Sequence, residues 1–384
     1  MSFDLSRRSL LGGALTGAAT AAASGTIMSP AMARTCLNLE PGKKESMYGP
    51  DPSDAWLIFN ENPFGPSPAA LKALAEASTQ GAYYQNQSTA YLAEMIAERH
   101  GVAPEQVMIS NGSYEGLTAV ALAFRNEGTT LGCDLFWDST ARYAERNGFS
   151  TIVRAPMKDG MQVDLEKIKA MVDDSVGLVH IVNPNNPTGV MLPPEELRAF
   201  IKEVAPQKTV LVDEAYIELS DDPEGNSMMD LLRDGENIIV ARTFSKIYGM
   251  AGLRVGYTIA QPDMIEKIRP YIVSSPNVAG IAAAINSYND EAFLKYSKER
   301  LVAAREMIME GAKANGLTAL PSQTSFVFVD TGMDADVFRD RMGEKGVRIR
   351  GTYGDFTPYS RVSCGYEKDV KRYVDAIPYA LDGA

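Results

Sequence analysis

The sequence predicts a large α/β domain with a mostly parallel central sheet, followed by a small α+β domain. In the first two thirds of the chain, short unbroken apolar runs alternate with helical patterns, which is typical of parallel strands covered by helices on both faces. Beyond about residue 270, a long helical stretch leads to runs in which apolar and polar residues alternate, as in a smaller, partly exposed sheet. The length of 384 residues suits about two domains.

Helices and strands alternate along the expected large domain. Helical patterns occupy four segments: 68–78, 88–99, 114–124 and 194–204. Short apolar runs, which we interpret as strands, occupy four others: 107–109, 177–182, 209–212 and 237–240. Because these runs are continuous rather than alternating, the strands are expected to be buried on both faces of the sheet.

The expected small domain contains a long helix at 290–315. Three strand-like runs follow this helix, at 326–329, 347–350 and 359–364. We divide the chain into a signal segment, an N-terminal arm, a large domain and a small domain, with the boundaries 1–33, 34–60, 61–269 and 270–384.

Composition excludes several classes of function. Hydrophobic residues make up 45% of the chain and charged residues 22%, as in ordinary globular proteins. The formal charge of −12 argues against a nucleic-acid partner, because an acidic chain does not hold a phosphate backbone through bulk electrostatics. The chain has only two histidines, so we expect neither a histidine-rich metal centre nor a Ser-His-Asp triad, and no bound metal. Phosphate-loop, nucleophile-elbow and dinucleotide-binding motifs are also absent from the sequence.

The first 33 residues have the pattern of a secretory signal. Ser6-Arg7-Arg8-Ser9-Leu10-Leu11 precedes a mildly apolar run, and Ala31-Met32-Ala33 offers a small-x-small cleavage site. The paired arginines resemble those of the bacterial twin-arginine (Tat) signal, so we expect a periplasmic product with no membrane contact after cleavage. An ordinary amphipathic N-terminal helix is the alternative interpretation.

Polar side chains follow three of the expected strands at the points where the strands end. Asn183-Pro184-Asn185-Asn186-Pro187-Thr188-Gly189 follows the first, and Asp213-Glu214-Ala215-Tyr216 follows the second. The third is followed by Ala241-Arg242-Thr243-Phe244-Ser245-Lys246, with Arg254 a few residues beyond. Ligands of open α/β sheets bind beyond the carboxyl ends of the strands, so an amide, a carboxylate, a phenol, an amine and a guanidinium are expected to meet there.

This set of groups matches the requirements of pyridoxal phosphate. A lysine forms a Schiff base with the cofactor aldehyde, and a carboxylate keeps the pyridine nitrogen protonated so that the ring can accept electrons. An amide and a phenol can donate to the ring's 3-oxygen, while an arginine and hydroxyl groups can hold the phosphate.

Five stretches, taken in order, carry a resemblance to a known family. They are Asn60-Glu61-Asn62-Pro63-Phe64-Gly65-Pro66, Asn111-Gly112-Ser113, Asn185 to Gly189, Asp213 to Tyr216, and Ser245-Lys246 through Gly256-Tyr257. In these residues the chain resembles the fold-type-I pyridoxal phosphate enzymes, within them the histidinol-phosphate aminotransferase-like branch of class I/II aminotransferases. The resemblance implies the same fold class as the strand pattern: a large, mostly parallel α/β domain and a small α+β C-terminal domain.

On the cofactor side, the resemblance implies a role for each matching residue. Lys246 is the Schiff-base lysine and proton carrier, Asp213 pairs with the pyridine nitrogen, and Asn186 and Tyr216 bind the 3-oxygen. The phosphate is held by residues near two turns: Thr243, Ser245, Arg254, Gly112, Ser113 and Tyr114. Trp137 occupies the position of the aromatic residue that stacks on the ring.

On the substrate side, the resemblance assigns fewer residues. Arg361 matches the arginine that binds the anionic group of the substrate. Asn62, in the stretch from Asn60 to Pro66, is assigned to the substrate-binding residues. Arg350 is either a second anion clamp or an ordinary surface residue. Tyr84 occupies the position of a tyrosine that reaches the cofactor of the neighbouring subunit, which implies a homodimer.

The expected activity is amino transfer between a small-molecule donor, an amino acid or a histidinol-phosphate-like amine, and a 2-oxo acid acceptor. Other pyridoxal phosphate reactions on the same scaffold, catalysed by lyases, racemases, decarboxylases or cyclases, remain alternatives, as does a non-catalytic binder. The substrate half departs from the family pattern: Gln85-Asn86-Gln87 follows Tyr84, and the stretch between Arg350 and Arg361 is short.

Overall fold

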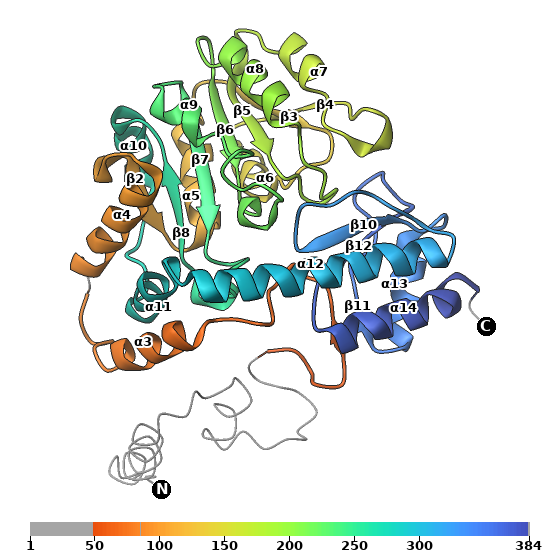
Figure 1. The fold of residues 1–384 in the computed structure, drawn as a ribbon. Helices are drawn as coiled ribbons and strands as arrows, with labels where there is room; N and C mark the ends of the chain where they lie inside the picture. Colours follow the sequence, from red (N-terminus) through yellow and green to blue (C-terminus); the bar gives the residue numbers. More distant parts are fainter. Residues whose placement is uncertain (1–48, 85, 383–384) are drawn as a thin grey trace, which may run out of the picture. The chain divides into compact units, whose positions relative to one another are not determined.

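A computed structural model describes residues 49–84 and 86–382 of the chain. The signal segment expected at 1–33 and most of the arm expected at 34–60 lie outside these residues. The fold discussed below is the compact unit formed by residues 53–384 (Figure 1). No helix within the described ranges has the length and apolar character that a membrane span needs.

A seven-stranded mixed sheet forms the centre of the larger part of the fold, with the strand order β2-β8-β7-β6-β5-β3-β4. Its strands are β2 (Val107–Ser110), β3 (Thr129–Cys133), β4 (Ile152–Ala155), β5 (Val176–Val182), β6 (Thr209–Asp213), β7 (Ile238–Thr243) and β8 (Gly256–Ile259). Strand β8 alone runs in the direction opposite to the other six strands, so the expectation of a mostly parallel sheet is confirmed. Every residue of β5, β6 and β7 is buried, as the unbroken apolar runs predict.

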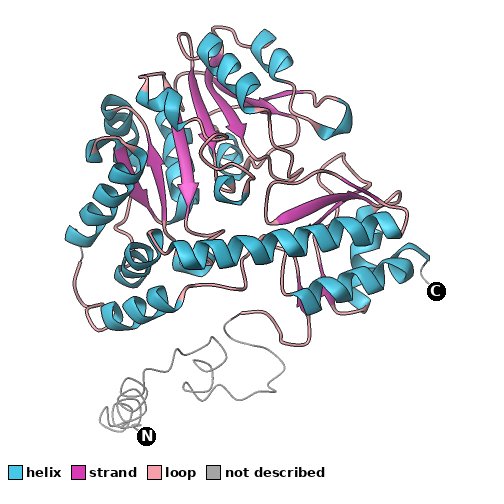
Figure 2. Ribbon diagram, viewed as in Figure 1, coloured by secondary structure: helices cyan, strands magenta, loops and turns pink. Residues whose placement is uncertain are grey.

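Helices pack on both faces of this sheet (Figure 2). The helices of this part of the chain are α3 (Pro68–Ser78), α4 (Gln87–His100), α5 (Gly112–Ala123), α6 (Ser139–Arg146), α7 (Leu165–Ala170), α8 (Pro194–Val204), α9 (Met229–Arg233), α10 (Pro262–Ile268) and α11 (Val278–Tyr288), of which α3 packs on α11. The four helices expected from the sequence are confirmed, and the bounds of α3 and α8 match. Both of these helices begin at a proline, which suits the first helical position because its missing N–H has no partner there.

A second, smaller sheet lies near the C-terminal end of the chain, with the strand order β12-β10-β9. The elements of this part are α12 (Glu291–Ala314), β9 (Thr318–Ala319), β10 (Phe326–Asp330), α13 (Ala335–Glu344), β11 (Val347–Arg348), β12 (Tyr359–Ser363) and α14 (Glu367–Asp382). The sheet is partly exposed as expected only at β9, whose two residues are not buried, whereas β10 and β12 are buried over four of their five residues. Helices α12 and α13 cover these strands, and Phe328 stacks on Tyr359 at a ring distance of 5.0 Å.

The N-terminal segment joins this C-terminal part rather than the seven-stranded sheet. Strand β1 (Ala55–Trp56) pairs in parallel with β11, and the Ser363 amide at the end of β12 donates to the Leu57 carbonyl. The residues that follow β1 are therefore held beside β12 at the edge of the larger sheet, where the candidate site lies.

Candidate active site

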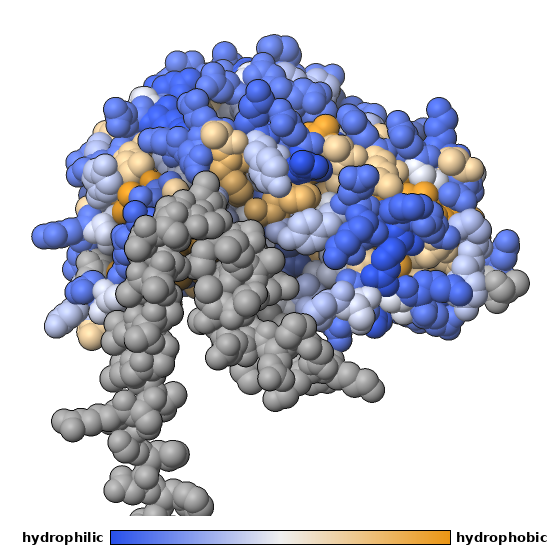
Figure 3. All heavy atoms as spheres, turned by 60° about the horizontal axis from the view of Figure 1, so that its bottom comes forward, coloured by the Kyte–Doolittle hydropathy of each residue, from blue (hydrophilic) through white to orange (hydrophobic). Residues whose placement is uncertain are grey.

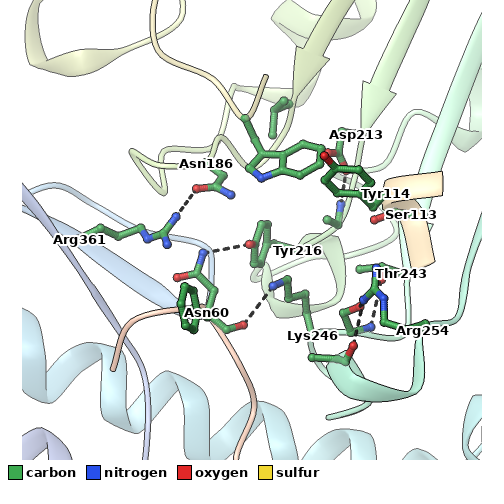
Figure 4. Close-up of a pocket in the computed structure, with 16 residues that line it drawn as sticks. Asn60, Ser113, Tyr114, Asn186, Asp213, Tyr216, Thr243, Lys246, Arg254 and Arg361 are labelled. Carbon is green, nitrogen blue, oxygen red and sulfur yellow. Dashed lines mark hydrogen bonds between the residues drawn. The ribbon is translucent and has the colours of Figure 1, made fainter. Parts of the chain in front are cut away.

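The carboxyl ends of β5, β6 and β7 meet at one cavity of about 260 Å³ (Figure 4). These strands are neighbours in the sheet, so the polar residues that follow them are brought together as the sequence predicts. The cavity is lined by eleven of the expected site residues: Ser113, Tyr114, Trp137, Asn186, Asp213, Tyr216, Thr243, Ser245, Lys246, Arg254 and Arg361. Five further lining residues were not predicted: Phe59, Asn60, Val182, Ala215 and Ala251.

Asp213 ends strand β6 with a buried carboxyl group. It accepts a hydrogen bond of 3.1 Å from the backbone N–H of Ala215. Burial raises the pKa of this carboxyl from 3.8 to about 7, although the bond from Ala215 and the charge of Lys246 oppose the shift. A buried carboxylate of this kind is stabilised by a ligand that brings a proton or a positive charge to it.

Lys246 lies in the loop after β7 and extends into the cavity. Its Nζ donates to the backbone carbonyl of Asn60 at 3.3 Å and lies 5.4 Å from the centre of the Tyr216 ring. The amine is therefore placed between the N-terminal segment and the phenol.

Asn186 and Tyr216 present hydrogen-bond donors to the cavity. Arg361 Nη1 donates to Asn186 Oδ1 at 2.7 Å, so the amide oxygen is engaged and the amide N–H groups remain for a ligand. Asn60 Nδ2 donates to the Tyr216 hydroxyl oxygen at 3.0 Å, which leaves the hydroxyl proton for a ligand.

A cradle for an anion lies at the N-terminus of α5. Gly112 has a φ of +75°, which favours glycine, and it lies against the guanidinium of Arg254, which would have to shift if a Cβ were added there. Arg254 itself has a left-handed backbone (φ 55°) and reaches Ser245 Oγ at 3.4 Å. The first backbone N–H groups of α5, Ser113 among them, have no partner within the helix and suit a phosphate.

Arg361 occupies the other end of the cavity. The guanidinium carbon lies 5.2 Å from the ring centre of Phe326 and 5.6 Å from that of Tyr353, and Nη2 donates to the Ile58 carbonyl at 3.1 Å. Its Nε is buried and has no hydrogen-bond partner in the described part of the chain. Desolvation lowers the pKa of the guanidinium, which an anionic ligand would offset.

Four expected site residues do not line the cavity. Gly112 lies directly behind Arg254, whereas Tyr84 is 94% exposed and Arg350 is exposed beside β12. Asn62 is buried, and its amide donates to the Ile247 carbonyl at 2.7 Å instead of facing the cavity.

Asn60 takes the place in the cavity that the sequence interpretation gave to Asn62. Both residues belong to the Asn60-Glu61-Asn62-Pro63 stretch, so the motif contained the relevant signal. The choice between them depends on the backbone, because Asn60 has a left-handed conformation (φ 57°) that turns its carbonyl and its amide toward the cavity.

The cavity fits pyridoxal phosphate on three independent features. A primary amine and a buried carboxyl with a raised pKa face the same space. Two donors, on Asn186 and Tyr216, are oriented by their neighbours for an anionic oxygen. The glycine-lined cradle beside Arg254 suits a phosphate. Together the fold and the site define a fold-type-I pyridoxal phosphate enzyme.

Comparison with known proteins identifies the family. Residues 55–377 match the family model of aminotransferases class I and II, and the chain belongs to this family. A histidinol-phosphate aminotransferase of Brevibacillus brevis is 33% identical over 335 residues, covering 85% of this chain and 90% of the relative. Histidinol-phosphate aminotransferase 1 of Dechloromonas aromatica is 35% identical over 331 residues, covering 85% of this chain and 89% of the relative.

A solved structure supports the cofactor. The histidinol-phosphate aminotransferase of Sinorhizobium meliloti, in complex with pyridoxal 5'-phosphate, superposes with a TM-score of 0.79 at 30% identity. The match covers 86% of this chain and 91% of that structure. The protein is therefore a pyridoxal phosphate-dependent aminotransferase, as the sequence predicts.

Proposed function

We propose that the chain transfers an amino group between an α-amino acid, or a histidinol-phosphate-like amine, and a 2-oxo acid, with Lys246 as the residue that binds the cofactor aldehyde. The observation that carries this proposal is the meeting of Lys246, Asp213 and Arg361 in one cavity. When bound, the cofactor supplies a ring that accepts the electrons of a substrate carbanion. Lys246 is the base that moves the proton away from the substrate α-carbon.

The residues of the strand ends hold the cofactor in this proposal. Asp213 keeps the ring nitrogen protonated, because its buried carboxylate is stabilised by that proton. Asn186 and Tyr216 donate to the 3-oxygen. The phosphate is held at the start of α5 by a larger set of groups, contributed by Gly112, Ser113, Tyr114, Thr243, Ser245 and Arg254. Trp137 packs over the ring.

Arg361 binds the anionic group of the substrate. Its planar guanidinium offers a fork of donors that suits a carboxylate or a phosphate, and its Nε is still without a partner. The curated relatives named above are histidinol-phosphate aminotransferases, so histidinol phosphate is one candidate donor for this chain.

The visible spectrum of the purified enzyme tests this proposal. Titration with single amino acids and with histidinol phosphate should remove the absorbance of the Lys246-bound cofactor when the donor is correct. A 2-oxo acid should then restore it, which shows that the amino group has left the enzyme. If no donor changes the spectrum reversibly, the proposed amino transfer is wrong and another reaction of the bound cofactor has to be sought.

We further propose that the enzyme is a homodimer in which Tyr84 completes the neighbouring site. Tyr84 is 94% exposed, its sequence neighbour Tyr83 is 68% exposed, and Tyr91 on α4 is 53% exposed. The face drawn in Figure 3 mixes hydrophilic and hydrophobic residues, and exposed tyrosines are a feature that a subunit interface would explain.

Mixing two impaired variants tests the shared site. Lys246→Ala and Tyr84→Ala chains are unfolded together, refolded together and assayed. Random pairing gives one composite intact site in half of the dimers, so about a quarter of the wild-type activity should return. No recovery, with dimers present by analytical ultracentrifugation, would show that Tyr84 acts within its own subunit.

Export through the twin-arginine route is a separate proposal, supported by Arg7, Arg8 and the Ala31-Met32-Ala33 site in the sequence. Exchange of both arginines for lysine should keep the protein in the cytoplasm, while the control Arg34→Lys should be exported normally. Normal export of the double variant would contradict this proposal.

A further inference from the structure

Asn60 links the N-terminal segment, the C-terminal sheet and the catalytic lysine. It is only 2% exposed and lines the cavity, although its motif suggested no role for it. Its backbone is left-handed, a conformation that asparagine tolerates better than most residues. This conformation turns the carbonyl toward Lys246 Nζ at 3.3 Å, as Figure 4 shows.

Ser363 fixes the orientation of the Asn60 amide. Its hydroxyl oxygen accepts from the Asn60 backbone N–H at 2.8 Å, and its hydroxyl proton is donated to Asn60 Oδ1 at 2.9 Å. Because a serine hydroxyl has one proton, this pair of bonds identifies the amide oxygen and leaves Nδ2 on the opposite side. The side chains of Ser363 and Asn60 are both buried, so water does not compete for these bonds.

The same chain of bonds sets the direction of the Tyr216 hydroxyl proton. Asn60 Nδ2 donates to Tyr216 Oη at 3.0 Å, so the phenol oxygen acts as an acceptor on that side. The single hydroxyl proton is then free to point into the cavity. A donated hydrogen bond also polarises the phenol and makes it a stronger donor to the next acceptor.

Ser363 lies two residues after Arg361 in strand β12, so both side chains point to the same face of the strand. The strand that binds the substrate anion therefore also holds Asn60.

We propose that Asn60, oriented by Ser363, is a positioning residue that directs the Tyr216 hydroxyl toward the cofactor's 3-oxygen and thereby lowers the basicity of the Lys246 nitrogen in the loaded enzyme. The inference rests on the proposed function, because it needs Tyr216 to donate to the cofactor. A weaker hydrogen bond from Tyr216 leaves the anionic 3-oxygen more basic. The proton that the 3-oxygen shares with the Lys246 nitrogen is then lost only at higher pH.

The pH midpoint of the visible absorbance change in the cofactor-loaded enzyme measures this effect without any assay of turnover. Asn60→Gly removes the amide but keeps the backbone carbonyl, and glycine adopts the left-handed conformation without strain. We expect the midpoint to rise by about 0.5 to 1 pH unit, the size that the loss of one hydrogen bond gives. Ser363→Ala frees the amide orientation and should raise the midpoint by a smaller amount.

Two reference variants separate this inference from the proposed function. Tyr216→Phe should raise the midpoint more than Asn60→Gly does, and in the Tyr216→Phe background Asn60→Gly should add no further shift. If Tyr216→Phe shifts the midpoint and Asn60→Gly does not, the role of Asn60 is wrong while the role of Tyr216 stands. If Tyr216→Phe leaves the midpoint unchanged, the cofactor assignment of Tyr216 fails, and the inference fails with it.

Thermal unfolding and the bound cofactor content are measured for every variant. If Asn60→Gly does not fold, the same double-mutant comparison is made with Ser363→Ala, measured alone and in the Tyr216→Phe background. A shift by Ser363→Ala of equal size in both backgrounds would show that the effect does not pass through Tyr216, which overturns the proposal.

Discussion

The two ends of the cavity are built in different ways. The cofactor end is made by residues at the ends of three adjacent strands of one sheet, namely Asn186 beyond β5, Asp213 at the end of β6, and Thr243 to Lys246 at and beyond the end of β7. The substrate end is made by residues far apart in sequence: Asn60 beyond β1 and Arg361 on β12. The first end is therefore a property of one sheet, whereas the second exists only when two sheets and the N-terminal segment are assembled.

The two ends also differ in how completely their buried polar side-chain atoms are paired. At the cofactor end, Thr243 Oγ1 bonds Ser245 Oγ, and Arg254 Nη1 bonds the Ala251 carbonyl at 2.9 Å. At the substrate end, Arg361 Nε is buried without a partner in the described residues. Buried polar groups normally have partners, so this end is arranged for an anionic or polar ligand that the chain itself does not supply.

The largest expected effect is at the cofactor end. Lys246→Ala should lower the rate of amino transfer by about a thousandfold or more, because it removes both the attachment of the cofactor and the base that moves the proton. The visible absorbance of the bound cofactor should be lost as well. Lys72→Ala, at a lysine side chain that is 79% exposed, is the control and should behave as wild type. Retained colour in Lys246→Ala would remove Lys246 from its assigned role.

The second effect is on stability and concerns Asp213 in the cofactor-free enzyme. Because burial raises its pKa to about 7, the folded state keeps a proton that the unfolded state releases above the ordinary value of 3.8. The folded state therefore binds more protons between these values, and the free energy of unfolding falls as the pH rises through them. Asp213→Asn lacks this dependence.

The measurement compares the two chains by urea unfolding from about pH 4 to about pH 8. The free energy of unfolding of wild type should fall relative to Asp213→Asn by up to about 4 kcal/mol over this range. Other titrating groups are shared by the two chains, so their effects cancel. A difference that is constant with pH would show that Asp213 ionises normally and that the cofactor end is less desolvated than its geometry indicates.

The contrast between the ends explains how much the sequence could predict. Asp213 and Lys246 were predictable because parallel strands end at a common edge, so position along a strand determines position in the site. Asn60 and Phe59 were missed because their place depends on the pairing of β1 with β11, across nearly the whole described chain. No local pattern identifies such a pairing.

The sequence also could not show which of two nearby asparagines faces the cavity. Asn60 and Asn62 share a motif, and only the left-handed backbone of Asn60 separates the residue that faces the cavity from the residue that binds Ile247. The burial of β10 and β12 was underestimated as well, because it depends on how α12 and α13 pack over these strands, which the pattern of the strand residues does not specify.

The third effect is at the substrate end. Arg361→Ala should raise the KM for the anionic substrate by about tenfold to a hundredfold, since a charge-assisted hydrogen bond is lost from a buried site. Arg361→Lys should recover only part of the loss, because an ammonium lacks the planar fork. The visible spectrum without substrate should keep the bound cofactor. An unchanged KM would mean that the substrate anion binds elsewhere and that the unpaired Nε of Arg361 is not part of the anion site.

The smallest expected effect concerns Arg350, which provides the matched comparison for Arg361. Its backbone N–H donates to the Arg361 carbonyl at 3.0 Å, but its side chain is exposed and does not line the cavity. Arg350→Ala keeps the backbone bond, so KM should change by less than about threefold, as for an exposed charge. A rise in KM as large as that of Arg361→Ala would show that the substrate extends beyond the cavity with a second anionic group. Arg350 would then belong to the substrate end.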